Sequence, residues 1–354
     1  MSYMFIVGGL VLLFCGGEAV VRGSVGVARK LGVSELVIGL TLVGFGTSAP
    51  ELVTSLKAVS KGAVGMSVGN VAGSNIANIL LVMGIAALIR PIVTKPSALT
   101  RDFTVMVFAT LVFAALAYYD IFTRPAGGIL VTLLILYIAS SFLLDKSNED
   151  AAMMHADEGE LIETNDPLPL ALVLAFGGIA GVVFGAELLV NGGIDVAERF
   201  GVSDTLIGLT FVAIGTSLPE VATVGMSAIR GKSDVALGTV LGSNIFNIFG
   251  IIGVTALVHP FSLFAPPAGG HGESSGVSSG SFDYSEVLTQ GSTALSSGHS
   301  LSWTDISTII LSVFLIIIFA FTGRQLARWE GAILLGSYGL YMGFLFNLVP
   351  TPFA

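Results

Sequence analysis

The chain has 354 residues, of which 53% are hydrophobic and 11% are charged, and its formal net charge is −9. Its mean hydropathy of +0.89 is far above that of a soluble domain. A soluble core cannot absorb so many long apolar runs, so the composition excludes a soluble globular protein and predicts a polytopic membrane protein. Most acidic residues lie outside the apolar runs, so the negative charge describes the loops rather than a binding partner.

The apolar runs predict an all-α membrane protein with about ten transmembrane helices, because roughly 20 apolar residues span a bilayer. The spans through Pro50 and Pro219 are predicted to be interrupted, since proline removes a backbone donor and the preceding Gly-Thr-Ser loosens the turn. In chain order the predicted helices lie near residues 3–22, 34–57, 66–89, 102–120, 126–144, 168–192, 203–228, 235–258, 303–322 and 329–348.

The chain contains an internal repeat with an offset of 169 positions. Residues 31–92 and 200–261 align without a gap and match at roughly 27 of 62 positions. This predicts two five-helix repeats, at 1–144 and 168–350. Because five is odd, the second repeat inserts upside down relative to the first, and such inverted repeats place a binding site at their interface near the bilayer midplane.

Two loops fall outside the repeated plan. The acidic stretch 145–167 lacks the ligand spacing of an EF-hand and is predicted to be a cytoplasmic linker. The stretch 261–302 is rich in Gly and Ser and is predicted to be an extracytoplasmic insertion. With the N-terminus outside, eleven basic residues fall in inner loops and four in outer loops, which by the positive-inside rule predicts that both termini are extracytoplasmic.

Each repeat places a carboxylate inside an apolar run, which is costly unless the acid faces a cavity, a partner or an ion. Hydroxyls and amides surround each acid, and the helix breaks free nearby carbonyls. All of these are hard oxygen ligands, which suit Ca²⁺ or Na⁺. A single hydroxyl could equally bond a backbone carbonyl, but both copies keep the whole set. The candidate ligands are Glu51, Glu220, Thr47, Ser48, Thr216, Ser217, Ser74, Ser243, Asn78 and Asn247, with the carbonyls of Gly44 and Ala213.

A second pair of acids, Glu18 and Glu187, is also related by the offset of 169 and lies near the ends of the first and sixth helices. We expect a structural ion pair or a gating role for these two residues rather than direct coordination of an ion.

The repeated motifs resemble a known family. GFGTSAPE with GSNIANI, and AIGTSLPE with GSNIFNI, are similar to the two alpha-repeats of the sodium/calcium exchanger family. The resemblance implies an antiporter that exchanges Ca²⁺ for Na⁺ by alternating access. It implies that Glu51 and Glu220 bind Ca²⁺ and that Asn78 lies at the site centre. The matching hydroxyl positions would serve largely Na⁺, and Gly44 and Ala213 would contribute backbone carbonyls.

One position departs from the family pattern. Well-known sodium/calcium exchangers carry an Asp where this chain has Asn247, so the centre offers two carboxylates. Two charges balance one Ca²⁺, but the coupling ion stays open between Na⁺ and H⁺. We therefore expect a cell-membrane antiporter that extrudes Ca²⁺ in exchange for Na⁺, with a Ca²⁺/H⁺ antiporter or a cation channel as alternatives. No enzyme activity, cofactor or nucleic-acid partner is expected; the partners are the transported ions and the lipid bilayer.

Overall fold

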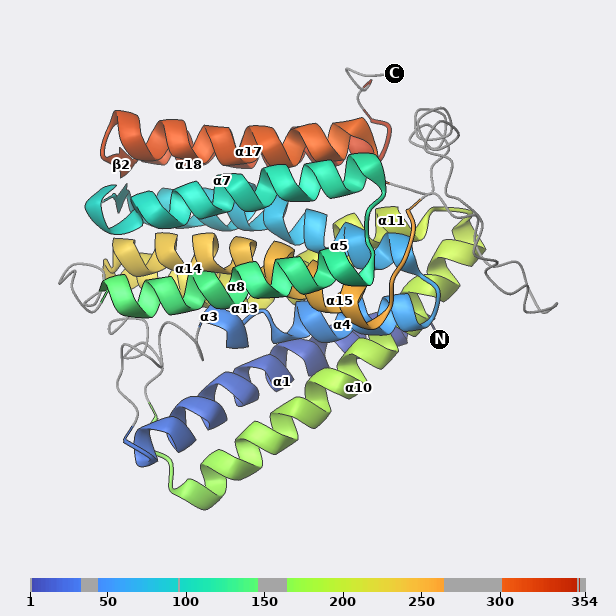
Figure 1. Ribbon diagram of the computed structural model, residues 1–354, viewed down its shortest axis with the longest axis horizontal. Helices are drawn as coiled ribbons and strands as arrows, with labels where there is room; N and C mark the ends of the chain where they lie inside the picture. Colours follow the sequence, from blue (N-terminus) through green and yellow to red (C-terminus); the bar gives the residue numbers. More distant parts are fainter. Residues whose placement is uncertain are drawn as a thin grey trace.

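The computed structural model describes residues 2–32, 44–94, 96–145, 164–263, 301–348 and 350 (Figure 1). The first half contains α1 (Ser2–Lys30), α3 (Gly44–Gly46), α4 (Ala49–Ser60), α5 (Val64–Ile76), the π-helix η2 (Ala77–Val82), α6 (Met83–Ile89), β1 (Ile92–Val93), α7 (Pro96–Tyr119) and α8 (Arg124–Asp145). The second half contains α10 (Leu168–Phe200), α11 (Asp204–Ile207), η3 (Gly208–Val212), α12 (Ala213–Thr216), α13 (Leu218–Arg230), α14 (Ser233–Phe246), η4 (Asn247–Ile252), α15 (Gly253–Val258), α17 (Trp303–Thr322), β2 (Gln325–Leu326) and α18 (Arg328–Leu345).

The prediction of an all-α polytopic membrane protein is confirmed. Within the described residues, seven helices are long and apolar enough to cross a membrane, and an eighth is added if the bent pair Asp204–Thr216 and Leu218–Arg230 counts as one span. Described helix also falls in each of the ten ranges that the sequence predicts. The predicted loops 145–167 and 261–302 lie mostly outside the described residues.

Two spans form the centre of the bundle. In the most apolar windows of Val64–Ile89 and Val235–Val258, 78% and 89% of the residues are buried, against 22% to 44% in the other five single spans. These two spans carry the repeated Gly-Ser-Asn motifs. The motifs are therefore surrounded by the rest of the bundle and do not face lipid.

Short backbone pairings join the two repeats reciprocally. Ile92 after the first central span pairs with Leu326, in the connection between α17 and α18. Phe261 after the second central span pairs with Phe122, in the connection between α7 and α8. Because Ile92 and Phe261 are related by the offset of 169, each repeat pairs with the other through the equivalent residue, as two-fold-related repeats do.

The same symmetry places a buried carboxylate–phenol pair in each half. The Tyr137 hydroxyl lies 3.2 Å from an Asp102 oxygen, between α7 and α8. The Tyr341 hydroxyl donates to Asp305 at 2.8 Å, between α18 and α17. These equivalent pairs extend the repeat beyond the segment in which the two sequences align without a gap.

Helices α1 and α10 form an antiparallel pair that crosses the bundle obliquely (Figure 1). Both are longer than predicted, because they continue as helix through charged last turns that a hydropathy count excludes. Their axes approach closely at glycines spaced by seven residues. A Cβ added to Gly9 would lie 2.7 Å from the Leu189 amide nitrogen, and one added to Gly16 would lie 2.8 Å from that of Val182. The glycines at these contacts are Gly9, Gly16, Gly23, Gly178, Gly185 and Gly192.

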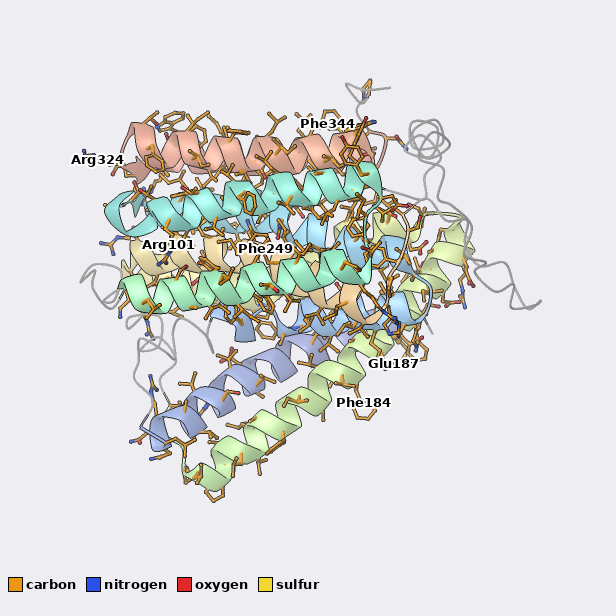
Figure 2. All side chains as sticks on the ribbon, viewed as in Figure 1. Arg101, Phe184, Glu187, Phe249, Arg324 and Phe344 are labelled. Atoms are coloured by element: carbon orange, nitrogen blue, oxygen red, sulfur yellow. The ribbon has the colours of Figure 1, made fainter. Side chains whose placement is uncertain are left out.

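The ends of the bundle are marked by different residues. Figure 1 shows that α1 begins and α18 ends on the same side, as an even number of crossings requires. Figure 2 shows Arg101 and Arg324 together at the opposite end, where basic loops are predicted to gather. Glu187 lies away from that end, on α10.

Candidate cation-binding site

The site begins with two helix breaks at equivalent positions. α3 stops at Gly46 and α4 starts at Ala49, with Pro50 in its first turn. In the second repeat the break falls at Ser217, where the chain bends by 46° before α13. A proline in a first helical turn costs no hydrogen bond, so each break restarts a helix at once. Both predicted interruptions are therefore found.

After each break, a glutamate lies in the first turn of the following helix: Glu51 in α4 and Glu220 in α13. Glu51 and Glu220 are both completely buried. The Ser48 hydroxyl donates to Glu220 Oε1 at 2.9 Å, and the Ser217 hydroxyl donates to Glu51 Oε1 at 3.2 Å. The serine of each repeat thus holds the acid of the other, which brings the two acids to one site. Ser243 adds a third hydroxyl, 3.3 Å from Glu220 Oε1.

The central asparagines lie in π-helical turns of the two most buried spans. Asn78 is in η2 and Asn247 is in η4, and both are fully buried. Wide π-helical turns inside α-helices are frequent at functional sites. Asn78 Nδ2 donates to Asn244 Oδ1 at 3.2 Å, and Asn247 Nδ2 donates to Asn75 Oδ1 at 2.9 Å. Each amide nitrogen thus donates one hydrogen bond to an asparagine of the opposite repeat.

Several buried oxygens around the two breaks have no hydrogen-bond partner in the described part of the chain. Such atoms are rare in a folded protein and call for an explanation such as an ion. A cluster that combines two carboxylates with neutral oxygens fits hard cations such as Ca²⁺ or Na⁺. The unpartnered oxygens of the predicted ligands are Glu51 Oε2, Glu220 Oε2, Asn78 Oδ1, Asn247 Oδ1, Thr47 Oγ1 and Ser74 Oγ.

The composition of this cluster also limits the kind of ion. Among the described residues, no group of three or more His, Cys, Asp or Glu side chains could hold a metal ion. The site therefore offers two formal charges and no thiolate or imidazole ligand, which does not fit a soft transition metal.

Two further predicted ligands, Thr216 and Ala213, have hydrogen-bond partners within the protein. The Thr216 hydroxyl donates to Asn70 Oδ1 at 3.0 Å and lies 3.0 Å from the Val212 carbonyl. The Ala213 carbonyl accepts the Ser217 amide at 3.1 Å. Gly44 opens α3 and Ala213 opens α12, so the two predicted carbonyl donors occupy equivalent places before the breaks. The two halves of the site are thus related but not identical.

Three buried asparagines of the site were not among the predicted ligands. Asn75 and Asn244 follow the repeated serines in both copies, so comparison of the repeats contains the signal that marks them. Asn70 donates to the Glu51 carbonyl at 3.3 Å and to the Ser55 hydroxyl at 3.0 Å. The residue that corresponds to Asn70 in the second repeat is Thr239, so repetition does not mark Asn70.

Glu187 and Glu18 lie apart from this cluster. Glu187 forms an ion pair with Lys57 at 2.9 Å and also pairs with Lys61, which joins α10 to the end of α4. This is the structural ion pair that the sequence predicts as one role for Glu187. Glu18 is exposed on α1.

Comparison with known proteins agrees with this geometry. The family described as sodium/calcium exchanger protein matches residues 1–143 and 170–347. The sodium/calcium exchanger MaX1 of Methanosarcina acetivorans is 33% identical over 98% of this chain and 99% of its own length. The inner membrane protein YrbG of Escherichia coli is 33% identical over 73% of this chain and 79% of its own length. A structure of the sodium-calcium exchanger NCX_Mj, soaked with Na⁺ and Sr²⁺, superposes with a TM-score of 0.59 at 30% identity and covers 97% of this chain and 98% of that one. The chain therefore belongs to the sodium/calcium exchanger family.

Proposed function

We propose that this protein is a secondary-active antiporter that exchanges Ca²⁺ for Na⁺ across the membrane by alternating access and normally extrudes Ca²⁺. The observation that carries the proposal is that Glu51 and Glu220, linked through the crossed serine bonds, each keep one buried carboxylate oxygen without a partner among the described residues. Two relatives support it, since both MaX1 and NCX_Mj are named sodium/calcium exchangers.

The charge of the site matches its proposed cargo. Glu51 and Glu220 together supply two negative charges, which neutralise one Ca²⁺ in surroundings where an unpaired charge is costly. Ca²⁺ takes roughly six to eight oxygen ligands, and the predicted hydroxyls, amides and carbonyls can complete such a shell. Na⁺ uses the same kind of oxygen. Because one set of oxygens serves both ions, their occupancy is mutually exclusive, which is what exchange requires.

Alternating access needs an element that covers the site and can move. α1 passes directly over both helix breaks, since a Cβ added to Gly17 would lie 3.2 Å from Pro50 Cγ and 3.7 Å from Pro219 Cγ. The backbones of α1 and α10 approach closely along their glycines, so the proposed mechanism treats the two helices as one moving unit. In the proposed mechanism this pair slides past the breaks and opens the site to one side of the membrane at a time.

The proposed location is the cell membrane, with both termini outside. The distribution of basic residues supports this orientation. Figure 1 shows α1 beginning on the side where α18 ends, which is consistent with both termini lying on one side of the membrane.

The test is ⁴⁵Ca²⁺ uptake into proteoliposomes that contain the purified full chain. Vesicles loaded with Na⁺ and diluted into Na⁺-free medium are expected to accumulate Ca²⁺, and vesicles without an ion gradient are not. Equal accumulation driven by a pH gradient in the absence of Na⁺ would replace Na⁺ coupling by H⁺ coupling. Rapid Ca²⁺ flux that needs no counter-ion on the far side would identify a channel.

A further inference from the structure

We infer that Asn75 and Asn244 are positioning residues of the ion site, which fix the side-chain amides of Asn78 and Asn247 with their oxygens toward the ion. This inference rests on the proposed function and adds two residues to it. Both residues are buried, with 3% and 1% of their surface exposed, and neither is a predicted ligand.

The amides form two directional chains. In one, Asn244 Oδ1 accepts Asn78 Nδ2 at 3.2 Å, which leaves Asn78 Oδ1 without a partner. In the other, Asn75 Oδ1 accepts Asn247 Nδ2 at 2.9 Å, which leaves Asn247 Oδ1 without a partner. The two unpartnered oxygens occupy equivalent places in the repeats.

The positioning asparagines are themselves oriented. Asn75 Nδ2 donates to the Asn244 backbone carbonyl at 3.4 Å, and Asn244 Nδ2 lies 3.9 Å from the Met106 sulfur. Each therefore presents its oxygen and not its nitrogen to the ligand asparagine. Rotating Asn78 or Asn247 by half a turn would set two acceptor oxygens against each other in a buried place, which is unfavourable.

The direction of these amides matters for a cation. An amide oxygen is a neutral acceptor that suits Ca²⁺ or Na⁺, whereas an NH₂ group in the same place would repel either ion. The bonds also cross between the repeats, from η2 to α14 and from η4 to α5. Each repeat thus orients the amide ligand of the other, as each serine holds the other repeat's glutamate.

Equilibrium ⁴⁵Ca²⁺ binding to the purified full chain tests the inference. Asn75→Leu removes the acceptor for Asn247 Nδ2 and should raise the Kd for Ca²⁺ about tenfold. Thr255→Val is the matched control, because it removes a buried hydroxyl from α15 without touching the amides.

A double-mutant cycle separates positioning from a general structural role. If Asn75 acts through Asn247, Asn75→Leu should change the Kd less than about twofold when Asn247→Ala is already present. The reciprocal cycle of Asn244→Leu with Asn78→Ala gives the same test if Asn75→Leu does not fold.

The outcomes are distinguishable. Ca²⁺ binding by the unaltered chain together with an unchanged Kd in Asn75→Leu, or a tenfold effect that persists beside Asn247→Ala, would overturn the positioning role alone. Absence of Ca²⁺ binding by the folded, unaltered chain would overturn the proposed function, and the positioning role with it.

Discussion

At the scale of single residues, the number of titratable groups at the proposed site depends on position 247. In the proposed site Asn247 contributes a neutral oxygen, and its nitrogen donates to Asn75 Oδ1. Among the side chains with unpartnered oxygens at the site, Glu51 and Glu220 are therefore the only ones that titrate. Competition between protons and Ca²⁺ should act through these two glutamates.

Asn247→Asp should retain Ca²⁺ binding but change its pH dependence. A third carboxylate beside two others binds a proton more tightly than an isolated one, so Ca²⁺ would displace a proton that the unaltered site does not hold. The measurement is the Kd for ⁴⁵Ca²⁺ between about pH 5 and 9, where the variant should show a steeper loss of affinity as the pH falls. Superimposable pH profiles would argue against Asn247 as part of the centre.

The sequence predicts the side chains gathered at the helix breaks, but not the direction of every group. Two copies of one motif predict that Glu51 and Glu220 share a site, and the structure brings them together through the crossed serine bonds. The orientation of Asn78 and Asn247 depends on neighbours supplied by the opposite repeat, so local pattern cannot give it. Asn70 escapes prediction because only one repeat contains it.

At the scale of helices, the contact between α1 and α10 depends on glycine. Gly178 faces α1 so closely that an added Cβ would lie 2.5 Å from the Val20 amide nitrogen. Its neighbour Gly177 is exposed on α10, with no other atom within 4 Å of an added Cβ. The two adjacent glycines therefore form a matched pair of test positions.

Gly178→Ala should lower the thermal unfolding midpoint of the purified protein, because overpacking a close contact costs about 1–3 kcal/mol. Gly177→Ala should leave the midpoint unchanged or raise it, since alanine is favoured over glycine in a helix by about 0.5–1 kcal/mol. Equal midpoints for the two variants would show that the α1–α10 contact does not need glycine.

The elements were predictable where proline and hydropathy define them. Pro50 and Pro219 mark the two breaks in the sequence, and both are present. The π-helices η2, η3 and η4 were not predicted, because one extra residue in a helical turn leaves the hydropathy of a span unchanged. The glycine spacing in α1 and α10 is visible in the sequence, but its meaning depends on which helix lies opposite.

At the scale of the whole molecule, two related halves enclose one site. The reciprocal pairings of Ile92 with Leu326 and of Phe122 with Phe261 tie the halves together at both ends of the bundle. The halves are not identical, since the Thr216 hydroxyl donates to Asn70, whose counterpart in the second repeat is Thr239.

The proposed orientation can be tested by cysteine labelling in a background in which Cys15, exposed on α1, is replaced. His155→Cys in the acidic loop should be protected from a membrane-impermeant maleimide in intact cells, and Gly280→Cys in the Gly/Ser-rich loop should react. The reverse pattern would invert the topology and with it the proposed direction of transport.

The most direct measurement of the central claim is Na⁺-driven ⁴⁵Ca²⁺ uptake by Glu51→Gln and Glu220→Gln in proteoliposomes. Removing one of two buried charges leaves the other poorly matched to a divalent ion, a loss of about 3–5 kcal/mol, so uptake should fall to roughly 1% or less. Glu330→Gln is the control. Glu330 is buried and accepts a hydrogen bond from the Ala327 backbone amide at the start of α18, and a glutamine side-chain oxygen can accept the same bond. Uptake by Glu330→Gln should match the unaltered protein. Uptake at the unaltered rate by either folded site variant would contradict the assignment of the ion site to Glu51 and Glu220.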